Sequence, residues 1–522
     1  MHHISRGQKM QKGDFIRNNI DSTLIFEESG HLALYDNYTY RNQENLIWIS
    51  ENTSQGEIVY FEENGNLVMY NKSGLKIWET KTYNTQANAL IIDNYDLKII
   101  NIPVGRILVE DELHEFEVIS KFKPNRNLFE SPIKLGVVLI GSLLWQNNGS
   151  KDESNLRKNW RDRNFIKENN LKTIPVKFPI RYGRMSEGDI YTMVISEEFN
   201  KTDKLGTAIL LHANEEFQSL HELLSFANKL ALAEGMTRNE EPRTKLSWGF
   251  ISYAINPNST LKNNKALISH WEKLASKDNY FENFKVNSEL SSPINKNGSL
   301  KFLDNNWLVS DIEANNKIIN NLDIVLTTVT RPRYKKKPVE DFSKYPDIIE
   351  LRANVDNDKT RYYFYNNLIN GIETSQDKII LELNDKLSST NLPFDLKKGE
   401  FKRINNYLFY FSTDGRLQLY NLKKKKFVWS TTIYERGNLL SYQDDGNLVI
   451  YDGKNVVWSA DIYSKKGIGT KTTVLGFDKK IEIFENNIIL SVTNRKFCYV
   501  NNFGQEFFFT DIDLECKILL DN

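Results

Sequence analysis

Near the C-terminal end, one run places hydrogen-bonding side chains at every second position, as Gln443, Asp445, Asn447, Val449 and Tyr451. Alternate residues of a β-strand point to one face, so a strand here would present all five side chains together. The amides donate and accept hydrogen bonds, the carboxylate accepts them, and the tyrosine hydroxyl does both. Such a set can bridge neighbouring hydroxyls of a sugar ring, with Val449 against the C–H surface of that ring. Because each net hydrogen bond contributes about 1 kcal/mol, one shallow site binds weakly, and useful affinity requires several sites.

The same run also has an architectural interpretation. Asp445-Gly446 is a hairpin-turn signal. If the chain reverses at this pair, Gln443 and Asn447 leave the common face, and the residues serve only the fold. We favour the sugar site and keep the turn as the alternative.

The run belongs to a repeated pattern, in which a turn-like pair precedes Leu-x-apolar-Tyr and a Trp follows several residues later. The position numbers place successive copies 30 to 35 residues apart within each of two groups of three, one at either end of the chain. Such a period is typical of repeat architectures. The pattern residues aligned with Tyr451 are Tyr35, Tyr70, Ile100, Tyr420 and Phe484.

Each copy alternates polar and apolar residues and is rich in Val, Ile, Tyr and Phe, which favours strands. One copy cannot bury its own apolar face, whereas three can turn their apolar faces towards a common axis. The four strong copies each supply a large aromatic residue suited to that axis. We therefore predict a three-sheet prism over residues 8–118 and a second one over 392–520. The aromatic residues are Trp48, Trp78, Trp429 and Trp458.

The pattern Gln443-x-Asp445-x-Asn447-x-Val449-x-Tyr451 resembles the mannose-binding motif of the bulb-type lectins at every defined position. The resemblance extends over both terminal regions and implies β-prism folds with three-fold pseudo-symmetry. It further implies a carbohydrate-binding protein whose partner is a mannose-containing glycan. Tandem prisms of this kind also resemble the lectin-like bacteriocins, which lack so large a central insertion.

The other copies depart from the motif to different degrees. The second copy keeps Asn66, Val68 and Tyr70 but has Glu62 and Asn64 in place of the glutamine and aspartate, so we expect a weaker second sugar site there. The remaining copies are expected to be scaffold. Their motif positions hold Glu27, Ser29, His31, Ala33 and Tyr35 in the first copy, Ser412, Asp414, Arg416, Gln418 and Tyr420 in the fourth, and Lys98 and Glu482 in place of valine in the third and last.

The central region, residues 125–385, mixes helix and strand signals, so we predict an α+β domain between the two all-β prisms. Apolar residues at helical spacing predict helices over 217–233 and 266–277. Apolar runs predict strands over 131–145, 191–196, 206–212 and 379–383.

Three features of this region, in this order, resemble the gamma-glutamylcyclotransferase-like proteins. They are an apolar strand running into Gly141-Ser142-Leu143-Leu144, a strand that opens at Gly206-Thr207-Ala208, and a helix that ends in Glu234-Gly235. The resemblance implies that Gly141, Ser142 and Leu143 hold a substrate, and that Glu234 is a general acid/base in a cyclisation that releases oxoproline. Ile140 stands where that family has a tyrosine, which puts the pocket in doubt. An inactive version of the fold and an unrelated mixed domain are the alternatives, and Gly235 also suits a helix C-cap.

Bulk properties exclude several other classes of function. Lys plus Arg and Asp plus Glu both total 68, which gives no electrostatic reason to expect nucleic acid or an anionic membrane as a partner. The most apolar run, 135–145, is too short to span a bilayer. No zinc-ligand spacing or phosphate-binding loop occurs, so no metal or cofactor is expected. The two cysteines, Cys498 and Cys516, allow one disulfide at most.

The first residues of the chain are polar and lack the apolar core of a secretory signal. We expect a soluble protein that is cytoplasmic or leaves the cell by a route that needs no signal peptide. The sequence allows a homo-oligomer without requiring one.

Overall fold

The computed structural model describes most of the chain. Beyond Ser459 it describes only the backbone of four strands, 479–484, 487–492, 497–500 and 506–509. Before that residue, the parts outside the description are 1–2, 19–21, 37–45, 52, 94–95, 107, 109–115, 127, 148–154, 168–169, 239–240, 243, 277–281, 283, 287–290, 305, 337–339, 356–357, 384–393, 405, 432–435 and 444–447.

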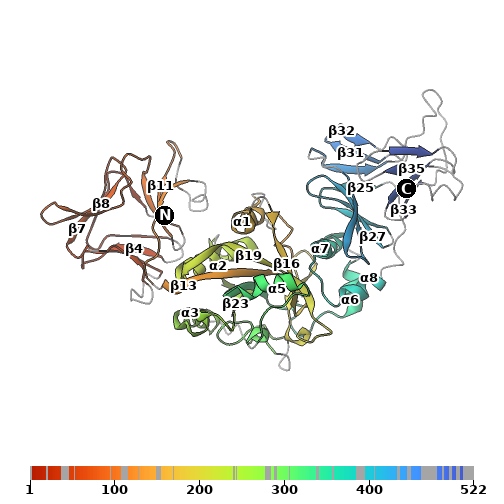
Figure 1. Ribbon diagram of the computed structural model, residues 1–522, viewed down its shortest axis with the longest axis horizontal. Coiled ribbons are helices and arrows are strands. Elements are labelled where there is room, and N and C mark those ends of the chain that lie inside the picture. Colours follow the sequence, from red (N-terminus) through yellow and green to blue (C-terminus); the bar gives the residue numbers. More distant parts are fainter. Residues whose placement is uncertain are drawn as a thin grey trace. The chain divides into compact units, whose positions relative to one another are not determined.

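The protein is built mostly of β-sheet, in several separate sheets with fewer helices (Figure 1). The chain forms two compact units, residues 1–185 with 192–345, and residues 186–191 with 346–522. The predicted domain limits, 8–118, 125–385 and 392–520, stay predictions.

Three four-stranded antiparallel sheets make up the N-terminal part of the first unit. Each sheet combines one of the first three strands with three later strands, so the N-terminal segment ties the sheets together. The first sheet is β3 (Phe15–Arg17), β4 (Thr23–Phe26), β5 (Leu32–Tyr35) and β6 (Leu46–Ile49). The second is β2 (Lys9–Gln11), β7 (Gly56–Phe61), β8 (Leu67–Asn71) and β9 (Lys76–Glu79). The third is β1 (Ile4–Ser5), β10 (Ala89–Asp93), β11 (Asp96–Asn101) and β12 (Glu117–Lys121).

The inward faces of these three sheets share one hydrophobic core. Equivalent residues such as Leu34 and Met69 lie in it and are almost fully buried. The predicted aromatic filling is present, because the ring centroids of Trp48 and Trp78 lie 6.0 Å apart. Phe122 packs edge-on against Trp48 at 5.0 Å. Successive side chains along each strand therefore point alternately into this core and away from it.

A six-stranded sheet dominates the rest of the first unit, in the order β16-β19-β13-β24-β23-β22. Only the β13–β24 pair among these described pairings is parallel. The strands are β13 (Leu128–Leu139), β16 (Thr173–Phe178), β19 (Gly206–Ser219), β22 (Lys245–Leu246), β23 (Gly249–Ile255) and β24 (Ile324–Thr330). Short pairs form from β14 (Ile166–Lys167) and β15 (Asn170–Leu171), β17 (Ile180–Met185) and β18 (Tyr191–Ile195), and β20 (Thr237–Arg238) and β21 (Glu241–Pro242).

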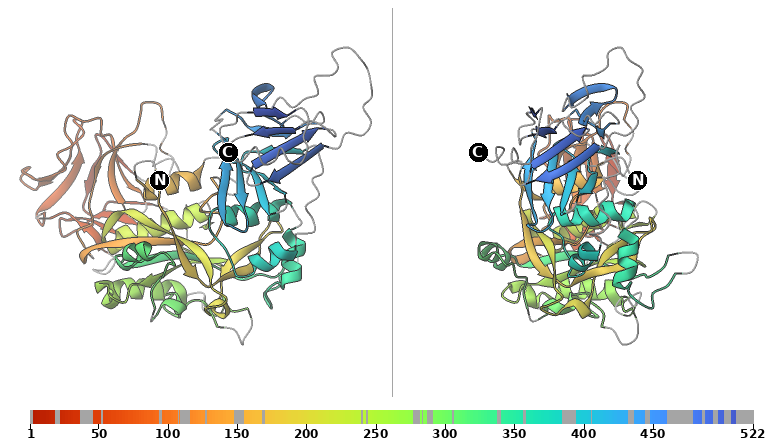
Figure 2. Two further views of the ribbon diagram at one scale, coloured as in Figure 1. Left: turned by 45° about the vertical axis from the view of Figure 1, so that its right-hand side comes forward. Right: turned by 90° about the vertical axis from the view of Figure 1, so that its right-hand side faces the viewer.

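Helices cover this sheet, and α2 and α3 lie on opposite sides of it (Figures 1 and 2). The Trp271 indole of α3 donates to the Ile251 carbonyl of β23 (2.9 Å). The helices are α1 (Leu156–Phe165), α2 (Leu220–Glu234), α3 (Lys265–Ser276) and α5 (Glu313–Asn320), with 3₁₀ turns at Glu197–Phe199, Thr260–Asn263 and Lys301–Leu303.

Helix α2 confirms the helix expected over 217–233 and shows why it forms. The Ser219 hydroxyl accepts from the Glu222 amide and the Glu222 side chain bonds back to the cap, a reciprocal capping box. Gly235 ends the helix in the left-handed region at φ 79°, the C-cap role that its position suggested. The strand expected to run through 131–145 instead ends at Leu139.

The described part of the second unit contains three further four-stranded sheets and three helices. Trp429 lies in its hydrophobic core and Trp458 packs against that core. The helices are α6 (Ile348–Val355), α7 (Asp358–Ile369) and α8 (Asp377–Leu383). The sheets are β26 (Phe401–Ile404), β27 (Tyr407–Phe411), β28 (Leu417–Asn421) and β29 (Lys426–Ser430); β25 (Phe394–Lys397), β30 (Leu439–Tyr442), β31 (Leu448–Asp452) and β32 (Asn455–Ser459); and β33 (Lys479–Phe484), β34 (Asn487–Val492), β35 (Phe497–Val500) and β36 (Glu506–Phe509).

The strand expected over 379–383 was wrong, because these residues belong to helix α8. Thr374 and Asp377 cap its start: the Thr374 amide donates to Asp377 Oδ2 (2.7 Å) and the Thr374 hydroxyl to Oδ1 (3.0 Å). This local bonding stabilises a helix start just before a short apolar run. The run itself is too short for its periodicity to separate helix from strand.

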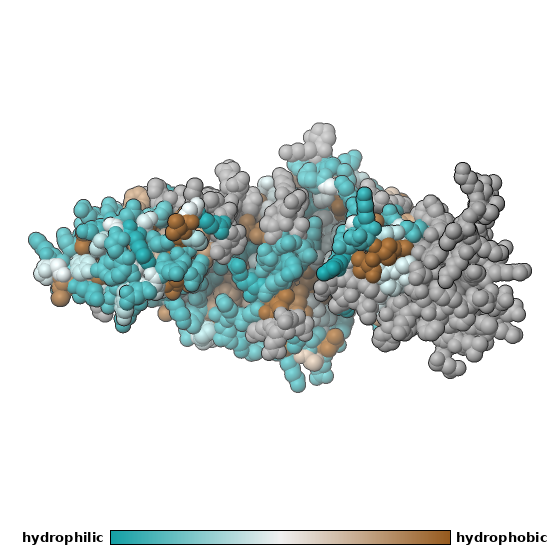
Figure 3. All heavy atoms as spheres, turned by 90° about the horizontal axis from the view of Figure 1, so that it is seen from above, coloured by the Kyte–Doolittle hydropathy of each residue, from teal (hydrophilic) through white to brown (hydrophobic). Residues whose placement is uncertain are grey.

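The face drawn in Figure 3 is mostly hydrophilic where it is described, with hydrophobic residues in small separate groups. Among the described residues, no helix combines the length and apolar character needed to cross a membrane.

The shared N-terminal core yields a first prediction. Replacing Trp48, which is 7% exposed, with alanine removes the ring that contacts both Trp78 and Phe122. We expect the free energy of unfolding of the N-terminal part to fall by about 3–5 kcal/mol, measured by denaturant titration of the full chain. Tyr83→Ala, at a residue that is 52% exposed, is the control and should cost no more than about 0.5 kcal/mol. Equal losses for the two variants would contradict a core built on Trp48.

Candidate functional site

The motif region of the second copy is a hairpin connection. Strands β7 and β8 pair with Phe61 opposite Leu67, and Glu62 to Asn66 join them. The Glu62 amide donates to the Asn66 carbonyl (2.8 Å), and the Gly65 amide to the Glu62 carbonyl (3.0 Å). Gly65 has φ 90°, a left-handed conformation that a side chain would strain. The first and fourth copies close the same turn, Glu27 with His31 and Ser412 with Arg416.

The motif of the fifth copy, which is complete, also spans the connection between two paired strands. Strands β30 and β31 are antiparallel, with Tyr442 opposite Leu448, so the chain reverses between them. The expectation that one continuous strand carries the motif was therefore wrong. The turn signal at Asp445-Gly446 outweighs the alternating pattern because a hairpin lets both flanking strands bury their apolar faces. Asp445 and Asn447 lie outside the described residues.

The hairpin nevertheless brings the first and ninth motif residues together. The Gln443 side-chain amide donates to the Tyr451 hydroxyl (2.7 Å), and both side chains are half-buried. Val449 is only 2% exposed, so it lies beneath the surface instead of presenting an open apolar face. The same pairing recurs in the second copy between Tyr70 and Glu62, and in the first between Tyr35 and Glu27.

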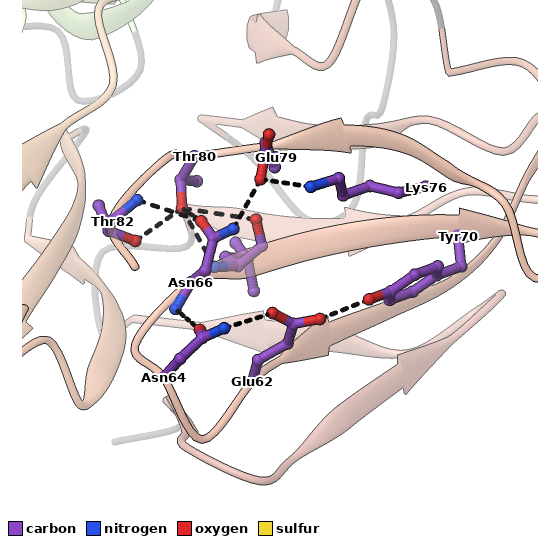
Figure 4. A network of polar contacts seen from close by, with 9 residues as sticks. Glu62, Asn64, Asn66, Tyr70, Lys76, Glu79, Thr80 and Thr82 are labelled. Atoms are coloured by element: carbon purple, nitrogen blue, oxygen red, sulfur yellow. Dashed lines mark hydrogen bonds and ion pairs between the residues drawn. The ribbon is translucent and has the colours of Figure 1, made fainter. Parts of the chain in front are cut away.

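In the second copy, a polar network surrounds this pairing (Figure 4). The Tyr70 hydroxyl donates to Glu62 Oε1, and Asn64 Nδ2 donates to Glu62 Oε2 (2.9 Å). The hydrogen bond to Glu62 is the main reason why the pKa of Tyr70 is raised to about 12. Tyr70 therefore stays protonated and acts as a donor to the carboxylate at any physiological pH.

Asn66 plays a different part in that network, because it is only 2% exposed. Its Nδ2 donates to Glu79 Oε2 (2.8 Å), and its Oδ1 accepts from Thr80 Oγ1 (3.0 Å) and from the Thr82 amide (3.1 Å). Hydrogen bonds from Lys76 and from Asn66 hold the pKa of Glu79 below its usual value. Asn66 thus fixes the loop, while Glu62, Asn64 and Tyr70 lie at the surface.

The first and fourth copies use several of their motif positions for internal contacts. The Tyr420 hydroxyl donates to the Leu368 carbonyl of α7 (3.2 Å), and Arg416 pairs with Asp414 (2.9 Å). In the first copy, His31 Nδ1 lies 2.9 Å from the Ser50 carbonyl oxygen. In the third copy, Lys98, the residue in place of valine, forms an ion pair with Asp93. The side chain of Glu482 in the last copy lies outside the description.

The second group of candidate residues lies in the central sheet's unit. Gly141 to Leu143 follow β13 and begin a helical turn, in which Ser142 O accepts from the Gln146 amide (2.8 Å). Arg157 of α1 donates to Ser142 Oγ (2.9 Å) through Nη1, and through Nε to the Ala233 carbonyl of α2 (3.1 Å). Arg157 therefore links the predicted substrate loop to the end of the helix that carries Glu234.

Glu234 is half-buried. Burial raises the pKa of its carboxyl group, while the charge of Arg157 and the neighbouring Thr328 hydroxyl oppose the shift. The predicted substrate loop and the predicted acid/base are thus joined through one arginine that the sequence analysis did not single out.

Arg161, one helical turn further on, holds the same loop. It is 5% exposed and donates through Nη1 to the carbonyl groups of Leu143 (2.6 Å) and Gln146 (2.8 Å). Burial lowers the pKa of Arg161 to about 10. The i, i+4 spacing of Arg157 and Arg161 places both on one face of α1, but it does not show which loop they contact.

No family model matches the chain. Over 60 residues it is 40% identical to a mannose-specific lectin of Narcissus tazetta, which covers 12% of this chain and 43% of that protein. A mannose-specific lectin of Narcissus pseudonarcissus is 38% identical over 60 residues, 12% of this chain and 55% of that protein. The chain thus spans about half the length of these curated relatives, at 43% and 55%.

Solved structures of mannose-binding lectins also align with part of the chain. The monomeric monocot lectins of Gastrodia elata align over 23% of this chain and 94% of theirs, at 19% identity and a TM-score of 0.18. The snowdrop (Galanthus nivalis) agglutinin, complexed with methyl-α-D-mannoside, aligns over 20% of this chain and 98% of its own, at 22% identity and a TM-score of 0.18. The sequence matches over 60 residues make a part of this chain homologous to mannose-specific lectins, whereas the resemblance of the central region to the gamma-glutamylcyclotransferase-like proteins stays a prediction.

Proposed function

We propose that the protein is a lectin that recognises mannose-type glycans through the β30–β31 hairpin. Gln443, Asp445, Asn447 and Tyr451 supply the polar contacts, and Val449 supports them from beneath. The observation that carries the proposal is the Gln443–Tyr451 hydrogen bond, which places two motif residues side by side at a half-buried surface. The partial homology to proteins named mannose-specific lectins supports it.

The direction of that hydrogen bond suits a neutral sugar. Gln443 Nε2 uses one of its two hydrogens on Tyr451, which leaves the other hydrogen and Oε1 for a ligand. The Tyr451 oxygen accepts from Gln443, so the hydroxyl proton is free to be donated. Sugar hydroxyls both donate and accept, and this mixed set matches them without an unpaired charge.

The second copy is a weaker sugar site in this proposal, because only Glu62, Asn64 and Tyr70 remain at its surface while Asn66 is used internally. Binding through more than one hairpin, or through several copies of the chain, would raise the avidity for a branched glycan. The central region, which the lectin-like bacteriocins lack at this size, is then a spacer or an effector.

The contacts of Arg157 favour a second candidate function, an enzyme of the gamma-glutamylcyclotransferase-like type. In that reaction, the α-amine of a γ-glutamyl compound attacks the γ-carbonyl carbon, the five-membered ring of oxoproline closes, and an amine leaves. Glu234 would take the proton from the attacking nitrogen and give it to the leaving one. A half-buried carboxyl group with a raised pKa is suited to both steps near neutral pH.

The lectin proposal is tested by titrating the full chain with a mannose-terminated oligosaccharide in a calorimeter. Gln443→Ala removes the amide that bonds Tyr451, and we expect at least about tenfold weaker binding, since a lost hydrogen-bonding partner costs about 1–3 kcal/mol. Gln418→Ala, in the scaffold copy, is the matched control and should leave the affinity unchanged. Binding that is insensitive to both substitutions would rule out the β30–β31 hairpin as the site.

The enzyme proposal is tested by oxoproline release from γ-glutamyl dipeptides. We expect Glu234→Gln to lower turnover by at least about a hundredfold, the usual scale of general acid/base catalysis. Glu215→Gln, at an exposed position of β19, removes the same charge away from the loop and should leave turnover unchanged. A parent protein with no turnover on any of these compounds would contradict the enzyme proposal and leave the lectin proposal untouched.

Glu234 also yields a prediction about stability that needs no substrate. Because its pKa in the folded protein is raised above the usual 4.5, the folded state binds the proton more tightly than the unfolded state does. The resulting stabilisation is complete below that usual value and is lost as the pH rises through the raised pKa. Glu234→Gln keeps the group neutral, so we expect a Tm close to the parent's in acid and above it at neutral pH. A Tm difference that does not change with pH would contradict the raised pKa.

A further inference from the structure

The second and fifth copies differ at the first motif position, which is Glu62 in one and Gln443 in the other. This difference reverses the direction of the hydrogen bond between that residue and the tyrosine at the ninth position. In the fifth copy, the Gln443 amide donates to the Tyr451 hydroxyl. In the second copy, the Tyr70 hydroxyl donates to the Glu62 carboxylate. We propose that the β7–β8 hairpin binds a sugar that carries a protonated amine, in preference to a neutral hexose. This inference rests on the proposal that these hairpins are sugar sites.

The surface of the second copy is rich in acceptors. A carboxylate has about four acceptor positions. Two of those on Glu62 are taken, one by Tyr70 and one by Asn64. The Tyr70 proton is spent on Glu62, so Tyr70 can only accept from a ligand. The second hydrogen of Asn64 Nδ2 can still be donated to a ligand. The other groups left at this surface can only accept hydrogen bonds, and an ammonium group has three hydrogens to donate.

The charge of Glu62 also favours a ligand with a protonated amine. Within the part of the chain that the structure describes, Glu62 has no ion pair, whereas its neighbour Glu79 pairs with Lys76 (2.9 Å). The carboxylates of Glu62 and Glu79 both help to raise the pKa of Tyr70, so two carboxylates lie near its hydroxyl. A half-buried carboxylate without a counter-ion gains more from a cation than an exposed one does, because water screens it less.

The hairpin also leaves room for a ligand at this carboxylate. Glu62 and Tyr70 are half-buried and Asn64 is exposed, whereas Val68 is fully buried beneath them. The first copy has the same polarity, since Tyr35 donates to Glu27 (2.5 Å), and Glu27 is half-buried like Glu62. Tyr35, however, is only 6% exposed and packs in an apolar cluster with Ile25 and Leu46. The second copy is therefore the one that offers both the carboxylate and the tyrosine oxygen to a ligand.

Calorimetric titration of the full chain with mannosamine and with N-acetylmannosamine tests the proposal, because acetylation removes the charge and keeps the sugar. In a Gln443→Ala background, which silences the fifth copy, we expect mannosamine to bind at least about tenfold more tightly than the acetylated sugar. The preference should fade at a pH that leaves the amine neutral. Tyr70, with its pKa of about 12, stays protonated throughout that range.

Two substitutions make the test specific. Glu62→Gln should abolish the preference for mannosamine, and Glu63→Gln, which removes the same charge at the adjacent exposed residue, should retain it. The reciprocal change Gln443→Glu, made in a Glu62→Gln background, should give the fifth copy a preference for the amino sugar.

The outcomes separate this inference from the lectin proposal. Equal binding of the two sugars, or a preference that survives Glu62→Gln, overturns the inference. If the parent binds mannose through Gln443 and the second copy binds nothing, the inference fails and the lectin proposal stands. Binding of mannosamine through Glu62 without any binding of mannose upholds the inference and contradicts the fifth-copy site.

Discussion

One contact across a hairpin organises the candidate sugar sites. A connection of fixed length between two antiparallel strands sets the first and ninth motif residues side by side, as Gln443 with Tyr451 and Glu62 with Tyr70. In the first, second and fourth copies, whose turns are described, backbone hydrogen bonds and a left-handed glycine define this geometry, whatever the polar side chains are. The hairpin is therefore a constant frame, and the chemistry of each copy is decided by the residues placed on it.

The geometry of each hairpin depends on burial of the inward, apolar faces of the two strands that flank it. Residues such as Leu67 and Met69 enter the common core, so Val68 and Tyr70 must face the other way. A slip of one residue in register would exchange these two sets, at the cost of the whole apolar core. The aromatic cluster of Trp48, Trp78 and Phe122 helps to hold the sheets against one another.

The sequence predicts much of this fold because the relevant signals are local and repeated. The helical spacing of residues 217–233 indicates α2, and the recurring Trp positions indicate a shared core. The course of the motif was harder to predict, since alternation and the Asp445-Gly446 pair point to different structures. Helix α8 was mistaken for a strand, although the sequence contains Thr374-x-x-Asp377, a spacing that indicates a helix start. The roles of Arg157 and Arg161 depend on tertiary contacts with a loop, which spacing alone does not give.

The central claim is that the β30–β31 hairpin holds a mannose-type sugar at Gln443 and Tyr451. A crystal of the full chain soaked in methyl-α-D-mannoside tests it most directly. The account predicts density for the sugar in contact with both side chains and with the loop between the two strands. A well-ordered hairpin that stays without sugar at saturating concentration, or sugar bound only elsewhere, would contradict it.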